Sequence, residues 1–382
     1  MKSSKESISS PTPPAALERL FAEADIQFNG QRPWDIQVHS RDVYRRILVK
    51  GSLGLGESYM DGEWDTEQLD ETLRRLIRLA FERKHSAWGQ FQLFKSYLKY
   101  MLTNPQSRTG ASKSVRKHYE LGADLFEAML DPTMTYSCAY WKNASTLETA
   151  QLAKLELICR KLDLQPGQKL LDIGCGWGSM ARYAAEHHGV SVVGITNSPD
   201  QVKRARKECS GLPVRIELMD YRDLEGSYDN IVSIGMFEHV GVRNYPGFFR
   251  IVDHFLKDDG LFLLQTIGTM RTAHSPDPWI HKYIFPHGKL PSAKQLTTAL
   301  EPYFTLKDWQ CFGQDYDRTL MAWWDNYHSA WPNLNDHYDE RFYRMWKYYL
   351  LYCAGFFRSH YGNLWQLVLA KPARQHGYRP IC

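Results

Sequence analysis

The chain has 382 residues, 43% of them hydrophobic, which is enough for two domains or for one large decorated domain with a substantial core. Its formal net charge of +4 is too small to indicate nucleic acid as a partner. The seven cysteines include no CxxC pair and no run of 18 apolar residues occurs, so we expect a cytoplasmic protein without structural disulfides or a membrane span.

The N-terminal region is predicted to form a small, mainly helical domain over residues 15–102. A polar, disordered tail is expected before it at 1–14, and small and polar residues at 103–114 predict a linker after it. Within this domain, the glycine-punctuated stretch GSLGLGESYMDGEW at 51–64 favours tight turns over a long element.

A basic stretch runs through the predicted helix at 74–102. Between residues 72 and 117 the single acid is Glu82, set against Arg74, Arg75, Arg78, Arg83, Lys84, Lys95, Lys99, Arg108, Lys113, Arg116 and Lys117. A charge run of this kind is by default a solvated helix face.

From residue 115 to 382, short apolar runs alternate with helical patterns. The predicted strands are KLLDIG (169–174), SVVGIT (191–196), VRIELMD (214–220), NIVSIGMF (230–237), LFLLQTIG (261–268) and LWQLVLAK (364–371). Helices are expected at 179–188, at 338–357 and after Ser198, which is a plausible N-cap followed by Pro199 at the first helical position. This alternation predicts an α/β fold with a doubly wound, mainly parallel sheet.

The first of these strands runs into a glycine loop, LDIGCGWGS, in which Asp172 precedes Gly174, Gly176 and Gly178. A dinucleotide fingerprint would need Gly or Ala at 179, where the chain has Ser, and the second strand ends without the acid that holds a nicotinamide ribose. The spacing D-x-G-x-G-x-G instead resembles the S-adenosylmethionine loop of class I methyltransferases. The alternative is a glycine-rich strand–helix turn that binds no ligand.

The fourth strand ends in GMFEHVG, which places Glu238 at the same carboxyl edge of the sheet. The neighbouring Glu238 and His239 suggest a metal site, but no HExxH motif or second histidine cluster accompanies them, so we expect no metal. His239 is interpreted as structural, and Glu238 as a carboxylate that contacts the cofactor or the substrate.

The segments after the fifth strand, at 277–288 and 308–331, are unusually aromatic. Most of these rings are expected to pack in the core. The cluster of Tyr316, Trp323 and Trp324 suggests a pocket for a large apolar substrate, and aromatic faces can also stabilise a cation.

From about residue 25 to its end, the chain resembles the cyclopropane-fatty-acyl-phospholipid synthases. The motifs that carry the resemblance stand in the order of that family: GSLGLGESYMDGEW, HYELGADLF, YSCAYW, LDIGCGWG, GMFEHVG, KYIFPHG and TLMAWW. The resemblance implies a lipid-docking N-terminal domain and a catalytic domain over 115–382 with aromatic substrate-pocket insertions.

The activity that the resemblance implies is methylene transfer from S-adenosylmethionine to the cis double bond of an unsaturated acyl chain in a membrane phospholipid. A weakly nucleophilic alkene must be held in line with the sulfonium methyl in a dry pocket. Transfer leaves a carbocation, and ring closure then needs a base, which in this family is thought to be bound bicarbonate. A homodimer that works transiently at the inner face of the membrane is expected.

The bicarbonate pocket that the resemblance implies consists of Cys138, Glu238, Tyr316 and the backbone of Ile267. Glu238 would accept the hydrogen bond of the bicarbonate O–H. The chain departs from the family at Gln265, where a histidine is usual. A glutamine amide can still donate to an anion but cannot titrate.

The cofactor contacts that the resemblance implies map onto Tyr136, Ser137, Gly174, Gly176, Thr196, Gln201, Asp220 and Tyr221. Asp172 of the glycine loop is expected to contact the cofactor as well. Gln201 would stand in for the missing ribose-binding acid. Thr196 and Tyr221 could alternatively be strand-end packing residues.

With a phospholipid substrate implied, the basic stretch at 72–117 is interpreted as a reversible docking surface for anionic headgroups. A lipid-directed methyltransferase that forms a methyl branch instead of a ring is the nearest alternative, favoured by Gln265 alone. A catalytically inactive membrane-binding protein and a phospholipid N-methyltransferase are further alternatives.

Overall fold

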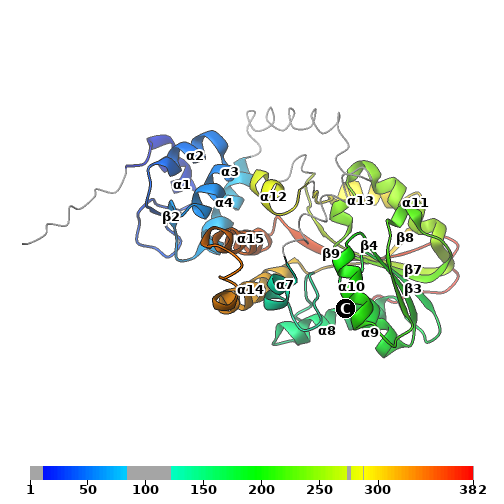
Figure 1. The fold of residues 1–382 in the computed structure, drawn as a ribbon. Helices are drawn as coiled ribbons and strands as arrows, with labels where there is room; N and C mark the ends of the chain where they lie inside the picture. The colour runs from blue at the N-terminus through cyan, green and yellow to red at the C-terminus, as the bar shows by residue number, and fades with distance from the viewer. Residues whose placement is uncertain (1–11, 84–121, 273–276, 287, 382) are drawn as a thin grey trace, which may run out of the picture.

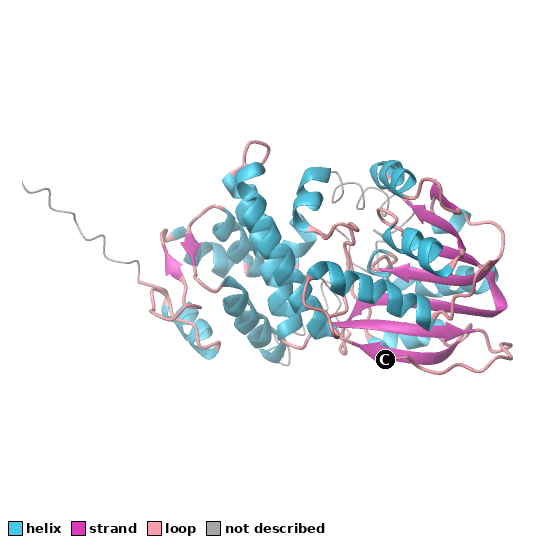
Figure 2. Ribbon diagram, turned by 90° about the horizontal axis from the view of Figure 1, so that it is seen from below, coloured by secondary structure: helices cyan, strands magenta, loops and turns pink. Residues whose placement is uncertain are grey.

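In a computed structural model, residues 12–83, 122–272, 277–286 and 288–381 are described. The predicted tail lies mostly outside these ranges, as do the linker at 103–114 and the basic stretch beyond residue 83. The described chain has a helical N-terminal part and a sheet flanked by helices, as Figures 1 and 2 show.

The sheet has seven strands in the order β5-β4-β3-β6-β7-β9-β8. All neighbours pair in parallel except β9, which is antiparallel to both β7 and β8. The strands are β3 (Lys169–Ile173), β4 (Ser191–Thr196), β5 (Val214–Leu218), β6 (Tyr228–Ile234), β7 (Leu256–Gly268), β8 (Thr305–Cys311) and β9 (Asn363–Ala370). The α/β prediction is therefore confirmed, with a reversed strand near one edge.

Helices cover both faces of the sheet. One face packs against α8 (Leu147–Lys161), α9 (Ser179–His188) and α10 (Pro199–Glu208), and the other against α11 (Tyr245–Phe255) and α13 (Ala293–Leu300). The Ser198 hydroxyl caps α10 by accepting from the Gln201 N–H, with Pro199 at the start of the helix as predicted. The predicted helix at 338–357 is α15 (Glu340–Arg358), which follows α14 (Gly313–Ala330).

The prediction for the segment around β8 was wrong. Residues 308–311 were expected to belong to an aromatic insertion, but they form most of this edge strand. None of its side chains is fully buried, so β8 lacks the apolar run that marks the inner strands. The strand expected at 230–237 also ends early, because Gly235 takes a φ of 65° and Phe237–His239 forms a 3-10 turn.

The N-terminal part contains α1 (Ala15–Glu23), α2 (Asp42–Lys50), α3 (Ser52–Met60) and α4 (Leu69–Arg83), with a two-stranded ribbon of β1 (Gln37–Val38) and β2 (Trp64–Asp65). The prediction of tight turns at 51–64 was wrong, since most of this stretch is α3. Its glycines permit close packing instead: a Cβ on Gly54 would lie 2.0 Å from the Arg46 carbonyl oxygen, and one on Gly56 2.4 Å from Trp279 Cδ1.

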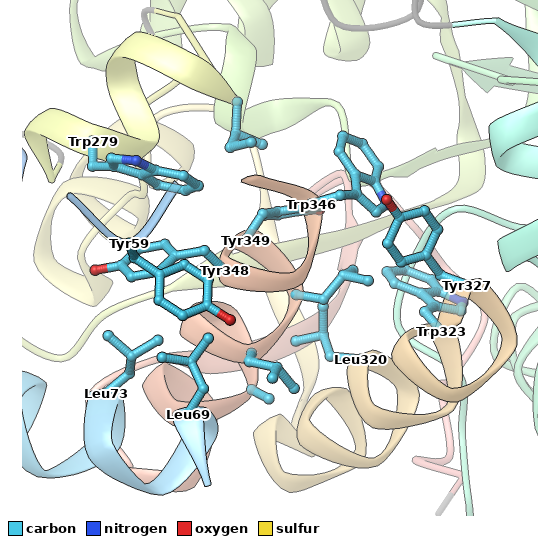
Figure 3. Packing of buried hydrophobic residues seen from close by; sticks show 14 of the residues in the cluster. Tyr59, Leu69, Leu73, Trp279, Leu320, Trp323, Tyr327, Trp346, Tyr348 and Tyr349 are labelled. Carbon is cyan, nitrogen blue, oxygen red and sulfur yellow. The ribbon is translucent and has the colours of Figure 1, made fainter. Parts of the chain in front are cut away.

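One hydrophobic core joins this N-terminal part to the rest of the chain. Figure 3 shows Tyr59, Leu69 and Leu73 facing rings from α15 and Trp279 of α12 (Pro278–Tyr283). The ring centroid of Tyr348 lies 4.5 Å from that of Trp279 and 5.6 Å from that of Tyr59. In the described part of the basic stretch, three arginines are ion-paired: Arg74 and Arg75 with Glu71, and Arg78 with Glu82.

Candidate active site

A pocket opens at the carboxyl edge of the sheet, where β3 passes into the glycine loop. Gly174, Gly176 and Gly178 all have left-handed φ values of 86°, 55° and 90°, which favour glycine over any residue with a side chain. A Cβ on Gly174 would also lie 2.8 Å from the Cβ of Met236 on the pocket wall. The loop therefore brings bare backbone against the space where a ligand would sit.

Eight of the nine residues expected to contact the cofactor line this pocket, namely Tyr136, Ser137, Asp172, Gly174, Gly176, Thr196, Gln201 and Tyr221. Asp220 is not among the lining residues. Its carboxylate instead accepts hydrogen bonds from the backbone N–H of Arg222 at 3.0 Å and from Arg222 Nε at 2.8 Å.

The carboxyl end of β4 holds Gln201 in a defined orientation. The Thr196 hydroxyl donates to Gln201 Oε1 at 2.6 Å, and both side chains are buried. Thr196 is thus more than a strand-end packing residue, because it positions the amide that was expected to replace a ribose-binding acid.

Lys154 also lines the pocket, although no residue of α8 was predicted for the site. Its side chain is fully buried, and Nζ donates to Ser137 Oγ at 3.0 Å. The available signal was a lysine on the apolar face of a helix, since Ala150, Lys154 and Ile158 recur every four residues and are all buried.

Asp172 and Lys154 perturb each other within this pocket. Burial raises the pKa of Asp172 to about 7, against the opposing charge of Lys154. Burial likewise lowers the pKa of Lys154 to about 8. Asp172 Oδ2 is buried and has no hydrogen-bond partner among the described residues.

A second group of residues lies beside the pocket. Cys138 packs with Ile267 and Tyr316 in a small apolar cluster that also contains Tyr140, Phe312 and Leu364. Glu238 joins this cluster through its Oε1 atom, which accepts a hydrogen bond of 2.6 Å from the Ile267 N–H. The structure thus brings together four of the five residues expected around an anion. Cys138 comes from the segment at 135–141, Glu238 from the turn that follows β6, Ile267 from β7 and Tyr316 from α14.

Glu238 is buried, and burial raises its pKa although the Ile267 N–H opposes the rise. Its Oε2 atom has no hydrogen-bond partner among the described residues. Burial raises the pKa of the Cys138 thiol far above its usual range, and the thiol donates to the Ala139 carbonyl at 3.2 Å. Cys138 is therefore a neutral thiol and not a nucleophile.

Gln265 is the fifth residue of the expected group, and it lies inside β7 with 1% exposure. Its Oε1 atom accepts a hydrogen bond of 2.9 Å from Nε2 of Gln366, the residue directly opposite on β9. This cross-strand bond anchors the Gln265 side chain within the sheet.

Tyr136 links the cofactor pocket to an aromatic wall. Its hydroxyl hydrogen-bonds the hydroxyl of Tyr349 on α15 at 2.6 Å, and its ring lies 5.1 Å from Trp323. Trp323 in turn makes an edge contact of 6.0 Å with Tyr316. Trp324 belongs elsewhere: it stacks on His328 at 5.0 Å, because adjacent residues of a helix point in different directions. All three residues belong to or pack against one hydrophobic core, but among the described rings Trp324 makes no contact with Trp323 or Tyr316.

His239 lines the cofactor pocket, and desolvation there lowers its pKa to about 4. It is neutral at physiological pH. Across the described ranges, no group of three or more His, Cys, Asp or Glu side chains is arranged to hold a metal ion. Nor does any helix in the described part have the length and apolar character needed to cross a membrane.

Comparison with known proteins identifies the family. The family model described as mycolic acid cyclopropane synthetase matches residues 106–367. The cyclopropane-fatty-acyl-phospholipid synthase of Escherichia coli K12 is 51% identical over 355 residues, which is 92% of each chain.

Two solved structures agree. The cyclopropane synthase MmaA2 of Mycobacterium tuberculosis superposes with a TM-score of 0.65 at 35% identity, covering 68% of this chain and 98% of that one. The mycolic acid cyclopropane synthase CmaA1, solved with SAH and CTAB, gives a TM-score of 0.64 at 34% identity with the same coverage. The chain is therefore an S-adenosylmethionine-dependent methyltransferase that belongs to the cyclopropane-fatty-acyl-phospholipid synthase family.

Proposed function

We propose that the protein adds a methylene group to the cis double bond of an unsaturated acyl chain in a membrane phospholipid. The single observation that carries this proposal is the position of Glu238. Its buried Oε2 atom has no hydrogen-bond partner among the described residues, and its Oε1 atom is bonded to Ile267 in the cluster of Cys138 and Tyr316. The next residue, His239, lines the pocket that fits the cofactor. Such an arrangement suits a reaction that passes through a cation and then loses a proton.

The residues present fit S-adenosylmethionine, because the glycine loop exposes backbone to the pocket and Gln201 is oriented by Thr196. When bound, this cofactor supplies the methyl group that is transferred. Tyr136 lies at the junction of the pocket and the aromatic wall, so its ring can exclude water from the reacting carbon.

Addition of a methyl cation to the alkene leaves a positive charge on the acyl chain. The ring of Trp323 contacts both Tyr136 and Tyr316, and aromatic faces stabilise a cation by roughly 0.5 to 2 kcal/mol each. Loss of a proton from the added methyl group, with formation of a carbon–carbon bond, then closes the ring and neutralises the charge.

Among the described neighbours of Glu238, neither the Cys138 thiol nor the Tyr316 hydroxyl is an ionised base for that proton, because burial raises both pKa values far above their usual ranges. The residues do fit a small oxyanion that carries a proton, since no hydrogen-bond donor in the described part of the chain uses Glu238 Oε2. Bound bicarbonate would supply a base there. Glu238 would accept its O–H, while the Tyr316 hydroxyl would donate to it.

We further propose that the protein reaches its substrate by docking reversibly on the bilayer surface. Helix α2 supports this, because Leu48 and Val49 are 56% and 76% exposed beside Arg41 and Arg45. Exposed aliphatic side chains with neighbouring basic residues match an anionic bilayer.

The homodimer expected from the family resemblance predicts a particle of about twice 44.5 kDa by light scattering.

The proposed activity is tested by incubating the protein with methyl-labelled S-adenosylmethionine and vesicles of a monounsaturated phospholipid. Label should enter the acyl chains of the extracted lipid, and vesicles of fully saturated phospholipid should take up none. Label in the headgroup, or none in either lipid, would reject the proposal. The methyl-branch alternative is not favoured, because the Escherichia coli relative that is 51% identical over 92% of each chain is a cyclopropane-fatty-acyl-phospholipid synthase.

A further inference from the structure

Lys154 is an unusual buried cation. It lies on the inner face of α8 with no exposed surface, and within the described residues no carboxylate oxygen comes within 4.0 Å of its Nζ atom. A buried charge is strongly unfavourable unless it is paired or bonded. Its hydrogen bond to Ser137 Oγ uses one of three N–H donors.

The same helix offers a comparison at Lys161. That side chain is equally buried, but its Nζ atom lies 2.8 Å from Asp308 Oδ2 in an ion pair. The ion pair with Asp308 therefore accounts for the burial of the Lys161 charge. Lys154 instead lines the cofactor pocket together with Ser137, so the polar atom that it bonds belongs to the same wall.

The cofactor carries one group that such a site would recognise. S-adenosylmethionine ends in an α-amino acid, and its α-carboxylate is its one anionic group. An ammonium and a hydroxyl side by side can both donate to a carboxylate, and hydrogen bonds between charged partners are the stronger kind. Asp172, whose buried Oδ2 lacks a partner among the described residues, would complement the α-ammonium at the other end of this zwitterion.

We propose that Lys154 is a cofactor-binding residue whose ammonium, together with the Ser137 hydroxyl, binds the α-carboxylate of S-adenosylmethionine. This inference rests on the use of that cofactor and goes beyond the residues expected from the family resemblance. It gives the buried lysine its missing anionic partner only when the cofactor is present.

The charge of Lys154 depends on the groups packed around it. Burial lowers its pKa to about 8, while Asp131, Cys138 and Asp172 act in the opposite direction. A lysine whose pKa is lowered is charged below that value and neutral above it. The preference for a ligand with a carboxylate should therefore be full near pH 7 and decline above about pH 8.

The test compares two ligands by calorimetry: S-adenosylhomocysteine and its decarboxylated analogue, which keeps the adenosine, thioether and amine. The wild-type protein should bind S-adenosylhomocysteine about 10- to 100-fold more tightly than the analogue, as expected for a charge-assisted hydrogen bond. Lys154→Met should reduce this preference to less than about 3-fold, mostly by weakening the carboxylate ligand. Lys161→Met is the matched control: it should lower stability and keep the wild-type preference.

The same two ligands also test the proposal in the wild-type protein, should Lys154→Met not fold. Their affinity ratio should fall as the pH rises from 7 to about 8.5, a range in which Lys154 loses its charge while the amines of both ligands stay mostly protonated. A ratio that is unchanged over this range, or that survives Lys154→Met, would overturn the role of Lys154 while leaving the cofactor assignment intact. Failure of the wild-type protein to bind S-adenosylhomocysteine at all would instead overturn the cofactor assignment, and this inference with it.

Discussion

The N–H of Ile267 donates a hydrogen bond of 2.6 Å to Oε1 of Glu238, tying the turn after β6 to the end of β7. The bond occupies one carboxylate oxygen and leaves Oε2 buried without a partner in the described part of the chain. Glu238 is thereby fixed in orientation while one acceptor is kept for a ligand.

Glu238→Gln should lower the rate of ring formation by about 10²- to 10⁴-fold, the range expected when a positioned proton-transfer system is lost. The amide can still accept from Ile267 but presents a donor where the bound anion needs an acceptor. Affinity for S-adenosylhomocysteine should not change, because Glu238 does not line the cofactor pocket. Initial rates measure the loss of ring formation, and calorimetry measures the affinity for S-adenosylhomocysteine. Glu225→Gln, at an exposed position, is the control. Full activity of Glu238→Gln would refute the anion assignment.

Asp172 should make stability depend on pH. Its pKa is about 7 in the folded protein against an ordinary value of 3.8, so the folded state binds more protons than the unfolded state between these values. Stability should therefore fall as the pH rises from 5 to 7, by roughly 2 to 3 kcal/mol from this group. In Asp172→Asn this contribution is absent.

Urea unfolding at pH 5 and at pH 7 measures this effect. The free energy of unfolding of Asp172→Asn, relative to that of the wild type, should be higher at pH 7 than at pH 5. The same variant should bind S-adenosylhomocysteine more weakly at pH 7. A stability difference that is constant with pH would show that Asp172 does not titrate in this range.

The positions of strands β3 to β7 along the chain, and of the helices between them, could be predicted from the sequence. Buried parallel strands are short apolar runs, and amphipathic helices separate them. The edge strand β8 could not be predicted, since its side chains are only partly buried. The glycines at 51–64 were misinterpreted for a related reason. A glycine that permits a turn and one that permits close packing look alike until the neighbouring element is known.

The residues of the candidate site could also be predicted only in part from the sequence. Residues in contiguous motifs, such as Tyr136, Ser137 and the glycine loop, could be placed at the pocket from the sequence. Lys154 could not, because its place in the pocket depends on how α8 packs beside the segment that carries Ser137. Asp220 was assigned by motif alone, and its carboxylate turns to Arg222.

Gly56→Ala tests the packing of α3. An added Cβ would lie 2.4 Å from Trp279 Cδ1, and Trp279 is fully buried and cannot move aside. We expect a loss of about 1 to 3 kcal/mol in the free energy of unfolding. Gly247→Ala in α11 is the matched control, because nothing lies within 4 Å of its added Cβ, and it should gain about 0.4 to 1 kcal/mol. Equal stability of the two variants would contradict the close packing of α3 on α12.

Docking through α2 predicts that Leu48→Asp combined with Val49→Asp weakens binding to anionic vesicles by at least about 10-fold, because both side chains lose apolar contact with the bilayer. Vesicle co-sedimentation measures this, and activity on vesicles should also fall as ionic strength rises. Leu306→Asp, at an exposed apolar position on β8, should bind vesicles as the wild type does. Equal activity at low and high salt would contradict electrostatic docking.

The central claim is that the product contains a ring. Proton NMR of phospholipid recovered after reaction with ¹³C-methyl-labelled S-adenosylmethionine tests it most directly, because cyclopropane protons resonate far upfield of other acyl protons. We predict that the label appears in these upfield signals while the alkene signals disappear in proportion. Label in an ordinary methyl branch, or alkene signals that persist unchanged, would contradict the account.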